Sequence, residues 1–94
     1  MQNPPKTIED ALKLLLSILD DDTRAMFGGR SEDEIKHYHC TAGVLIRKQF
    51  RLTEGNDALI ESCRNFSGRY DLDGKGASIV ILEELWKMLR HTTH

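Results

Sequence analysis

The chain has 94 residues, of which 39% are hydrophobic and 30% are charged, and its formal net charge is -2. A chain of this size can build one hydrophobic core but not two, and its composition lies outside the range of disordered proteins. The small net charge excludes a global field that would concentrate the protein on nucleic acid or on an anionic membrane. We therefore expect one folded domain over residues 1–94, with residues 1–6 as a flexible N-terminal arm.

The sequence also predicts a cellular location. The first six residues contain Pro4 and Pro5 but no basic leader with an apolar signal core behind it. The longest apolar stretch, residues 78–82, is far too short to span a bilayer. Cys40 and Cys63 are too few for a disulfide scaffold, which fits a reducing compartment. These features predict a cytoplasmic protein that does not associate with a membrane.

The first two predicted helices follow from their capping residues. Thr7 and Asp10 have the spacing of a capping box, so a helix should begin at Thr7. Apolar residues three and four apart then continue to Leu19 and predict a helix with a core face. Three consecutive aspartates from Asp20 are unfavourable at a helix C-terminus and favourable at an N-terminus. They predict a break, followed by a short helix that ends at the glycine pair of residues 28–29.

The remaining chain predicts three more helices at most. Ser31 and Glu34 form a second capping box, which should open the longest helix and carry it to about Arg51. Asn56 should cap the next helix, which Gly68 should end. Residues 69–76 should form a loop, and residues 77–89 have the apolar spacing of a last helix. The predicted fold is all-α, a compact single-domain bundle of four to five helices.

The order of several residues resembles a family of small, functionally uncharacterised bacterial helical domains. The resemblance is carried by a Tyr-His pair, a glycine, an Ile-Arg pair and a Leu-Trp pair with residues between them. In this chain these are Tyr38, His39, Gly43, Ile46, Arg47, Phe50, Leu52, Asn56, Leu59, Ser78, Ile81, Leu82, Leu85 and Trp86. The chain departs from the family in Lys48-Gln49 and in the loop that begins at Asp71. The resemblance implies a helical accessory domain and no established activity.

Within that pattern, His39, Gly43 and Arg47 are the first candidate binding site. They are four residues apart, so a helix would place them in one line. The missing side chain at Gly43 would let another helix or a ligand approach the backbone. Such a groove could bind a carboxylate or phosphate, or it could clamp a carbonyl of a neighbouring helix. We favour the structural role, because buried polar groups in small bundles usually fasten helices and loops.

Metal binding and catalysis are not indicated by the sequence. His37, His39 and Cys40 are close together, but a helix lets at most two of them converge, whereas zinc requires three or four ligands. The loop from Asp71 begins like a calcium-binding loop, but Lys75 and Leu82 occupy positions that need oxygen ligands. No nucleophile lies beside a base and an orienting group in a recognisable motif. We therefore expect no metal, no cofactor and no enzyme activity.

Two charged surfaces complete the list of candidates. Lys36, Arg47, Lys48 and Arg51 form the basic cluster, and Glu9, Asp10, Asp20, Asp21 and Asp22 form the acidic one. The acidic cluster would suit a basic protein partner. The main hypothesis is a non-enzymatic protein-interaction module that acts as an accessory, inhibitor or immunity-type factor, with homodimerisation left open. The alternative is nucleic-acid or nucleotide-phosphate binding through the basic cluster, which the net negative charge disfavours.

Overall fold

Six α-helices make up the part of the chain that the computed structural model describes, residues 4–38 and 41–92. In chain order they are α1 (Ile8–Ile18), α2 (Asp21–Gly28), α3 (Glu32–Tyr38), α4 (Ala42–Gln49), α5 (Asp57–Ser67) and α6 (Gly74–Thr92). These described residues contain no strand. The predicted all-α class is confirmed, whereas the predicted count of four to five helices is too low.

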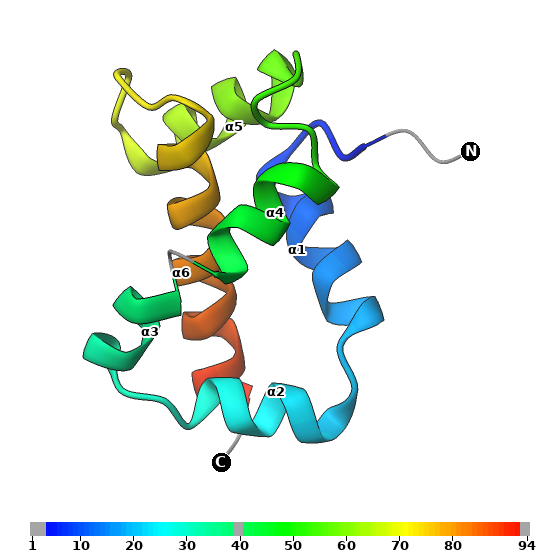
Figure 1. Cartoon of the computed structure of the whole chain (residues 1–94), viewed down its shortest axis with the longest axis vertical. Helices are drawn as coiled ribbons and strands as arrows, with labels where there is room; N and C mark the ends of the chain where they lie inside the picture. The colour runs from blue at the N-terminus through cyan, green and yellow to red at the C-terminus, as the bar shows by residue number, and fades with distance from the viewer. Residues whose placement is uncertain (1–3, 39–40, 93–94) are drawn as a thin grey trace.

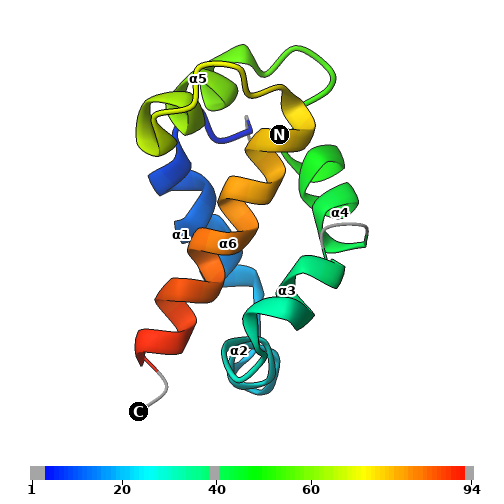
Figure 2. The same cartoon turned by 90° about the vertical axis from the view of Figure 1, so that its left-hand side faces the viewer.

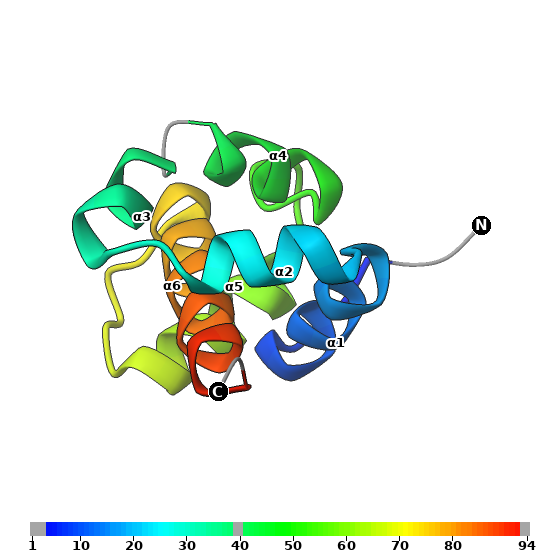
Figure 3. The same ribbon diagram turned by 90° about the horizontal axis from the view of Figure 1, so that it is seen from below.

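Helix α6 is the central element, and α1, α2, α4 and α5 all pack against it (Figure 1). Figure 2 shows α1 on one side of α6 and α4 on the other. Figure 3 shows α2 crossing beside the C-terminal part of α6. The radius of gyration of 12.6 Å is close to the value of about 12 Å that a compact chain of this length has. Within the described residues, no helix is long and apolar enough to cross a membrane.

The helix starts predicted at Thr7, at the three aspartates from Asp20 and at Ser31 are confirmed by side-chain caps, and Asp73 caps the last helix. The amides of Asp10, Thr23, Glu34 and Gly76 donate to the side-chain oxygens of Thr7, Asp20, Ser31 and Asp73, at 3.1, 2.7, 3.3 and 2.9 Å. Each cap satisfies a free amide of a first helical turn. The last helix is longer than predicted, because it begins at Gly74 directly after its cap and continues to Thr92.

The prediction of one long helix from Ser31 to about Arg51 is wrong, because the chain forms two helices there. Helix α3 ends at Tyr38 and α4 begins at Ala42. The amide of Thr41 bonds to the carbonyl of Tyr38 at 3.1 Å, which is the tighter turn of a helix end. The break lets each piece bury its own apolar side: Ile35 of α3 lines a hollow with Trp86, while Ile46 of α4 joins the main core.

The role predicted for Asn56 is also wrong. It precedes α5 as expected, but its side chain makes no capping hydrogen bond. Its Nδ2 donates instead to the carbonyls of Pro5 and Phe50, at 3.0 and 2.7 Å. Asn56 therefore ties the segment before α1 to the end of α4. The predicted end of α5 is confirmed, since Gly68 adopts a left-handed φ of 74° that glycine tolerates without strain.

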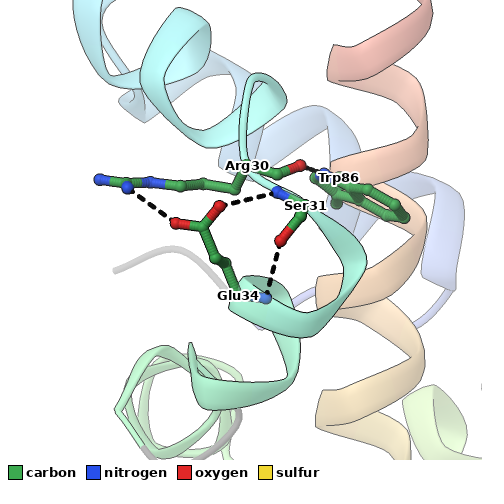
Figure 4. A network of polar contacts seen from close by, with 4 residues as sticks. All are labelled: Arg30, Ser31, Glu34 and Trp86. Carbon is green, nitrogen blue, oxygen red and sulfur yellow. Dashed lines mark hydrogen bonds and ion pairs between the residues drawn. The ribbon is translucent and has the colours of Figure 1, made fainter.

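A polar corner joins α2, α3 and α6 (Figure 4). The indole Nε1 of the buried Trp86 donates to the carbonyl of Arg30 at 2.9 Å. The amide of Ser31 donates to Glu34 Oε1 at 3.1 Å, which completes the predicted capping box. Arg30 adds an ion pair with Glu34 at 3.0 Å. The start of α3 is thereby fixed to the side of α6.

Candidate functional site

An apolar groove with a volume of 650 Å³ opens between α1, α2 and α4, and α6 forms its floor. The floor residues are Leu82 and Leu85, which are buried. The walls are mostly apolar and come from the ends of three helices and the residues beside them. They comprise Leu15, Ile18, Leu19, Thr23, Met26, Phe27, Tyr38, Ala42, Leu45, Ile46, Lys48 and Gln49. We call this feature the apolar groove.

The rim of the apolar groove carries large apolar side chains in contact with solvent. Ile18, Met26 and Leu45 are 60%, 55% and 68% exposed. The sequence pattern predicts Ile18 and Leu45 as core residues, and for these two the prediction is wrong. Single exposed leucines are ordinary on protein surfaces, but a contiguous patch around a concavity is typical of an interaction site.

The groove arises because α1 and α4 each have more apolar residues than α6 can cover. Leu12 and Leu15 of α1 are buried in the main core, whereas Ile18, one turn later, is not. Likewise Ile46 of α4 is buried while its neighbour Leu45 faces outward. The rings of Phe27 and Tyr38 lie against each other at one end of the groove, with centroids 5.9 Å apart and planes at 57°. This aromatic pair connects α2 to α3 beside the opening.

Polar groups are few in the apolar groove and lie at its edge. Thr23, Lys48 and Gln49 are the polar side chains of the lining apart from the Tyr38 hydroxyl. Among the described residues that line the groove, Lys48 is the only one with a formal charge. The lining side chains that an occupant would meet are therefore mostly apolar, with one positive charge among them.

Of the three residues predicted to form a site, His39, Gly43 and Arg47, His39 lies outside the described residues. Gly43 and Arg47 do come together, and Ser78 of α6 joins them. Arg47 Nη1 donates to Ser78 Oγ at 3.1 Å, and the fully buried Ser78 hydroxyl donates to the carbonyl of Lys75 at 2.7 Å. A Cβ at Gly43 would lie 3.6 Å from Arg47 Nη1 and 3.7 Å from Ser78 Oγ. The space beside Gly43 is thus bounded by these two side chains.

The four basic candidates do not form one helical face. Lys36 lies on α3, and Arg47 and Lys48 lie on α4. Arg51 comes after the end of α4 and has a left-handed φ of 55°. The helical spacing that would align Arg51 with Arg47 is therefore absent. Arg47 is also engaged with Ser78, so Lys48 and Arg51 are the exposed basic residues at this end of α4.

The acidic candidates are divided between the two ends of α1. Glu9 and Asp10 are in its first turn, whereas Asp20, Asp21 and Asp22 follow its last turn and begin α2. Helix α1 has 11 residues, so the two groups are separated by about 15 Å along its axis. Asp20 serves as the α2 cap, and the hydrogen bonds from Thr23 lower the pKa of its carboxyl. The acidic cluster expected from the sequence is therefore two separate groups, one at the N-terminus of α1 and one at the N-terminus of α2.

The described residues contain no group of three or more histidine, cysteine or acidic side chains that could hold a metal ion. Asp73, the third residue of the calcium-like loop, accepts a hydrogen bond from the Gly76 amide, which lowers the pKa of its carboxyl. Cys40 lies outside the described residues. Burial raises the pKa of the Cys63 thiol to about 11, so this thiol is protonated at neutral pH and is a poor nucleophile.

These observations define an all-α domain of six described helices with an open apolar groove on one face. The chain belongs to the family described as a domain of unknown function (DUF6794), which matches residues 4–89. No curated protein and no solved structure matches the chain. The resemblance to an uncharacterised family is thereby confirmed.

The apolar groove was not predicted from the sequence. Its rim residues have the same spacing as the core residues beside them, so periodicity assigned both sets to one stripe. The available signal was quantitative: α1 carries seven residues of the types Ile, Leu and Ala among its 11. This is more than one helical face holds, and it indicated a second apolar contact.

Proposed function

We propose that this protein is a non-enzymatic protein-interaction module and that the apolar groove is its binding surface. The observation that carries the proposal is the ring of exposed apolar side chains, Ile18, Met26 and Leu45, around a concavity with an apolar floor. A soluble domain gains stability when such a surface is covered, and binding another protein covers it. An accessory, inhibitory or immunity-type role is compatible with this mode of action.

The energetic scale shows how much contact a partner must make with the apolar groove. Full burial of one Leu, Ile or Met side chain is worth about 1.5 to 3 kcal/mol. Since more than half of each rim side chain is exposed, the three together would contribute about 3 to 5 kcal/mol. Association itself costs about 4 kcal/mol or more. A partner must therefore also contact the groove floor, which requires it to insert apolar side chains of its own.

The alternative of nucleic-acid or nucleotide-phosphate binding remains a separate hypothesis. Phosphate neutralisation by Lys48 and Arg51 would give an affinity that falls steeply as the salt concentration rises. Binding to DNA, RNA or nucleotides with such a salt dependence would support it. The separation of Lys36, Lys48 and Arg51 on different segments gives this alternative less support than the groove gives to protein binding.

The proposal is tested by affinity purification from the organism of origin. We compare the wild-type protein with Leu45→Glu, which places a charge on the groove rim, and with Phe66→Glu. Phe66 is a matched control because it is 53% exposed and lies outside the groove. Both substitutions are on the surface and should change stability by less than about 0.5 kcal/mol. We expect a stoichiometric partner with wild type and Phe66→Glu that Leu45→Glu loses.

Two results would count against the proposal. One is a partner that co-purifies equally with all three proteins, since the groove would then not be the binding surface. The other is the absence of any stoichiometric partner together with turnover of a substrate by the purified protein.

A further inference from the structure

We infer that the apolar groove is a docking site for one amphipathic α-helix of a partner protein, which carries a carboxylate beside its apolar stripe. The inference rests on the proposed function and adds the secondary structure and charge of the bound segment. Four properties of the groove carry it: the spacing of its walls, the exposure of its rim, the content of the chain's other surfaces, and the position of Lys48.

The spacing of the wall residues fits a helix. Each of three segments contributes side chains three or four positions apart: Leu15, Ile18 and Leu19 at α1; Thr23, Met26 and Phe27 on α2; Ala42, Leu45, Ile46 and Gln49 on α4. Such rows form the ridges and grooves into which the side chains of another helix pack. The α4 wall, seven helical steps from Ala42 to Gln49, is about 10 Å long. A bound segment of two to three helical turns would match it.

The exposed rim disfavours a small apolar ligand. Ile18, Met26 and Leu45 would stay largely in water if a ligand filled only the space above Leu82 and Leu85. A helix is about 10 Å wide with its side chains, so it would contact the floor and the rim together. Recognition of an amphipathic helix by an apolar groove uses this geometry.

The outer surface of the chain disfavours a second copy as the occupant. Among the described residues, the large apolar side chains that are exposed are Ile18, Met26, Val44, Leu45, Phe66 and Tyr70. Ile18, Met26 and Leu45 line the groove, and Val44 is next to Leu45. Phe66 and Tyr70 do not form a helical stripe, because α5 ends at Ser67 between them. Outside the groove walls, no described helix therefore offers an apolar stripe that a second copy could insert.

The position of Lys48 defines the charge of the bound helix. Lys48 is exposed and is one helical turn from Leu45 on the same wall. A helix whose apolar stripe contacts Leu45 would bring its flanking side chains near the Lys48 ammonium group. A Glu or Asp there would be attracted and a Lys or Arg would be repelled. The partner helix should therefore have an acidic residue on the flank that faces α4.

The test uses two displayed peptide libraries against the 94-residue chain. One library has 18-residue peptides in a helix-forming frame with apolar residues at positions i, i+3, i+4 and i+7 and a randomised flank. The other has extended peptides of the same length and composition interrupted by proline. We expect binders from the helical library with Glu or Asp enriched at the flank and with helical circular dichroism in the complex.

Variants then locate the bound peptide. Leu45→Glu and Met26→Glu should each raise the Kd of the selected peptide by about tenfold or more, whereas Phe66→Glu should leave this Kd unchanged. Lys48→Glu should also weaken peptide binding, and replacing the peptide's acidic flank residue by Lys should restore binding to that variant. The same reversal at the exposed Lys75, which is outside the groove, should have no effect.

Three outcomes would overturn the inference. Groove-dependent binders from the extended library alone would contradict the helix but leave the proposed function in place. A wild-type dimer in analytical ultracentrifugation that Leu45→Glu dissociates would make a second copy the occupant. Helical binders that Leu45→Glu and Met26→Glu do not weaken would place the docking site elsewhere. The proposed function is tested separately, by the purification from the organism of origin, so the two failures are distinguishable.

Discussion

Replacing Arg47 by alanine should destabilise the fold through loss of its contact with Ser78. A hydrogen bond to a charged group contributes about 1.5 to 3 kcal/mol when its partner is buried. Ser78 is fully buried, but its hydroxyl keeps its bond to the Lys75 carbonyl at 2.7 Å in the variant. Arg47 is also only half-buried, so its guanidinium keeps part of its hydration in the folded protein, and the contact contributes less than a fully buried one would. We therefore expect the free energy of unfolding to fall by about 1 to 2 kcal/mol.

Urea denaturation followed by fluorescence measures this change, because Trp86 is the single tryptophan and is buried. Arg69→Ala is the matched control, since Arg69 is exposed and should change stability by less than about 0.5 kcal/mol. A double-mutant cycle with Ser78→Ala isolates the energy of the contact. Equal midpoints for Arg47→Ala and Arg69→Ala would refute the structural role. If Arg47→Ala also lost partner binding, the guanidinium would serve a ligand instead.

Three further predictions concern other parts of the fold. Gly43→Ala should raise the melting temperature by about 2 to 4 °C, because alanine stabilises a helix by about 0.5 kcal/mol relative to glycine. The added Cβ would meet only ordinary van der Waals contacts, at 3.6 and 3.7 Å. A lower melting temperature would contradict this prediction. Hydrogen bonds from Ser31 and Arg30 lower the pKa of the Glu34 carboxyl. The contribution of Glu34 to the stability of the fold should therefore be fully present above its ordinary pKa of 4.5 and be lost as the pH falls through the lowered pKa. Glu34→Gln should reduce the fall of the melting temperature with decreasing pH in the range below 4.5. An unchanged dependence of the melting temperature on pH would contradict this prediction. In a Cys40→Ser variant, Cys63 should react with a thiol reagent at least 100-fold more slowly in the folded protein than in the urea-unfolded protein. The reason is that a pKa raised from 9.0 to about 11 lowers the thiolate fraction about 100-fold. Equal rates in the two states would show that the thiol is accessible.

Features that depend on neighbouring residues could be predicted from the sequence. The caps at Thr7 and Ser31 are local, because each cap and the amide that it satisfies are three residues apart. The helix end at Gly68 is local as well, because it depends on the left-handed φ that this glycine itself adopts. The all-α class follows from the same signals combined with apolar spacing.

Features that depend on distant residues could not be predicted. Asn56 has the residue type and position of a cap, yet its side-chain amide donates to the carbonyls of Pro5 and Phe50. Nothing in the neighbouring sequence indicates these two hydrogen bonds. The division between α3 and α4 likewise follows from how Ile35 and Ile46 reach different parts of the core. The apolar groove depends on the directions in which α1, α2 and α4 leave α6, and the spacing of Ile18 and Leu45 is the same whether they are buried or exposed.

Photo-crosslinking inside cells of the organism of origin shows whether the apolar groove binds another protein. A benzoylphenylalanine is placed at position 45 on the groove rim, and at position 66 as a control of similar exposure outside it. We expect one protein adduct of defined mass from position 45, which excess wild-type protein competes away, and no adduct from position 66. Equal adducts from the two positions, or none from position 45, would contradict this expectation.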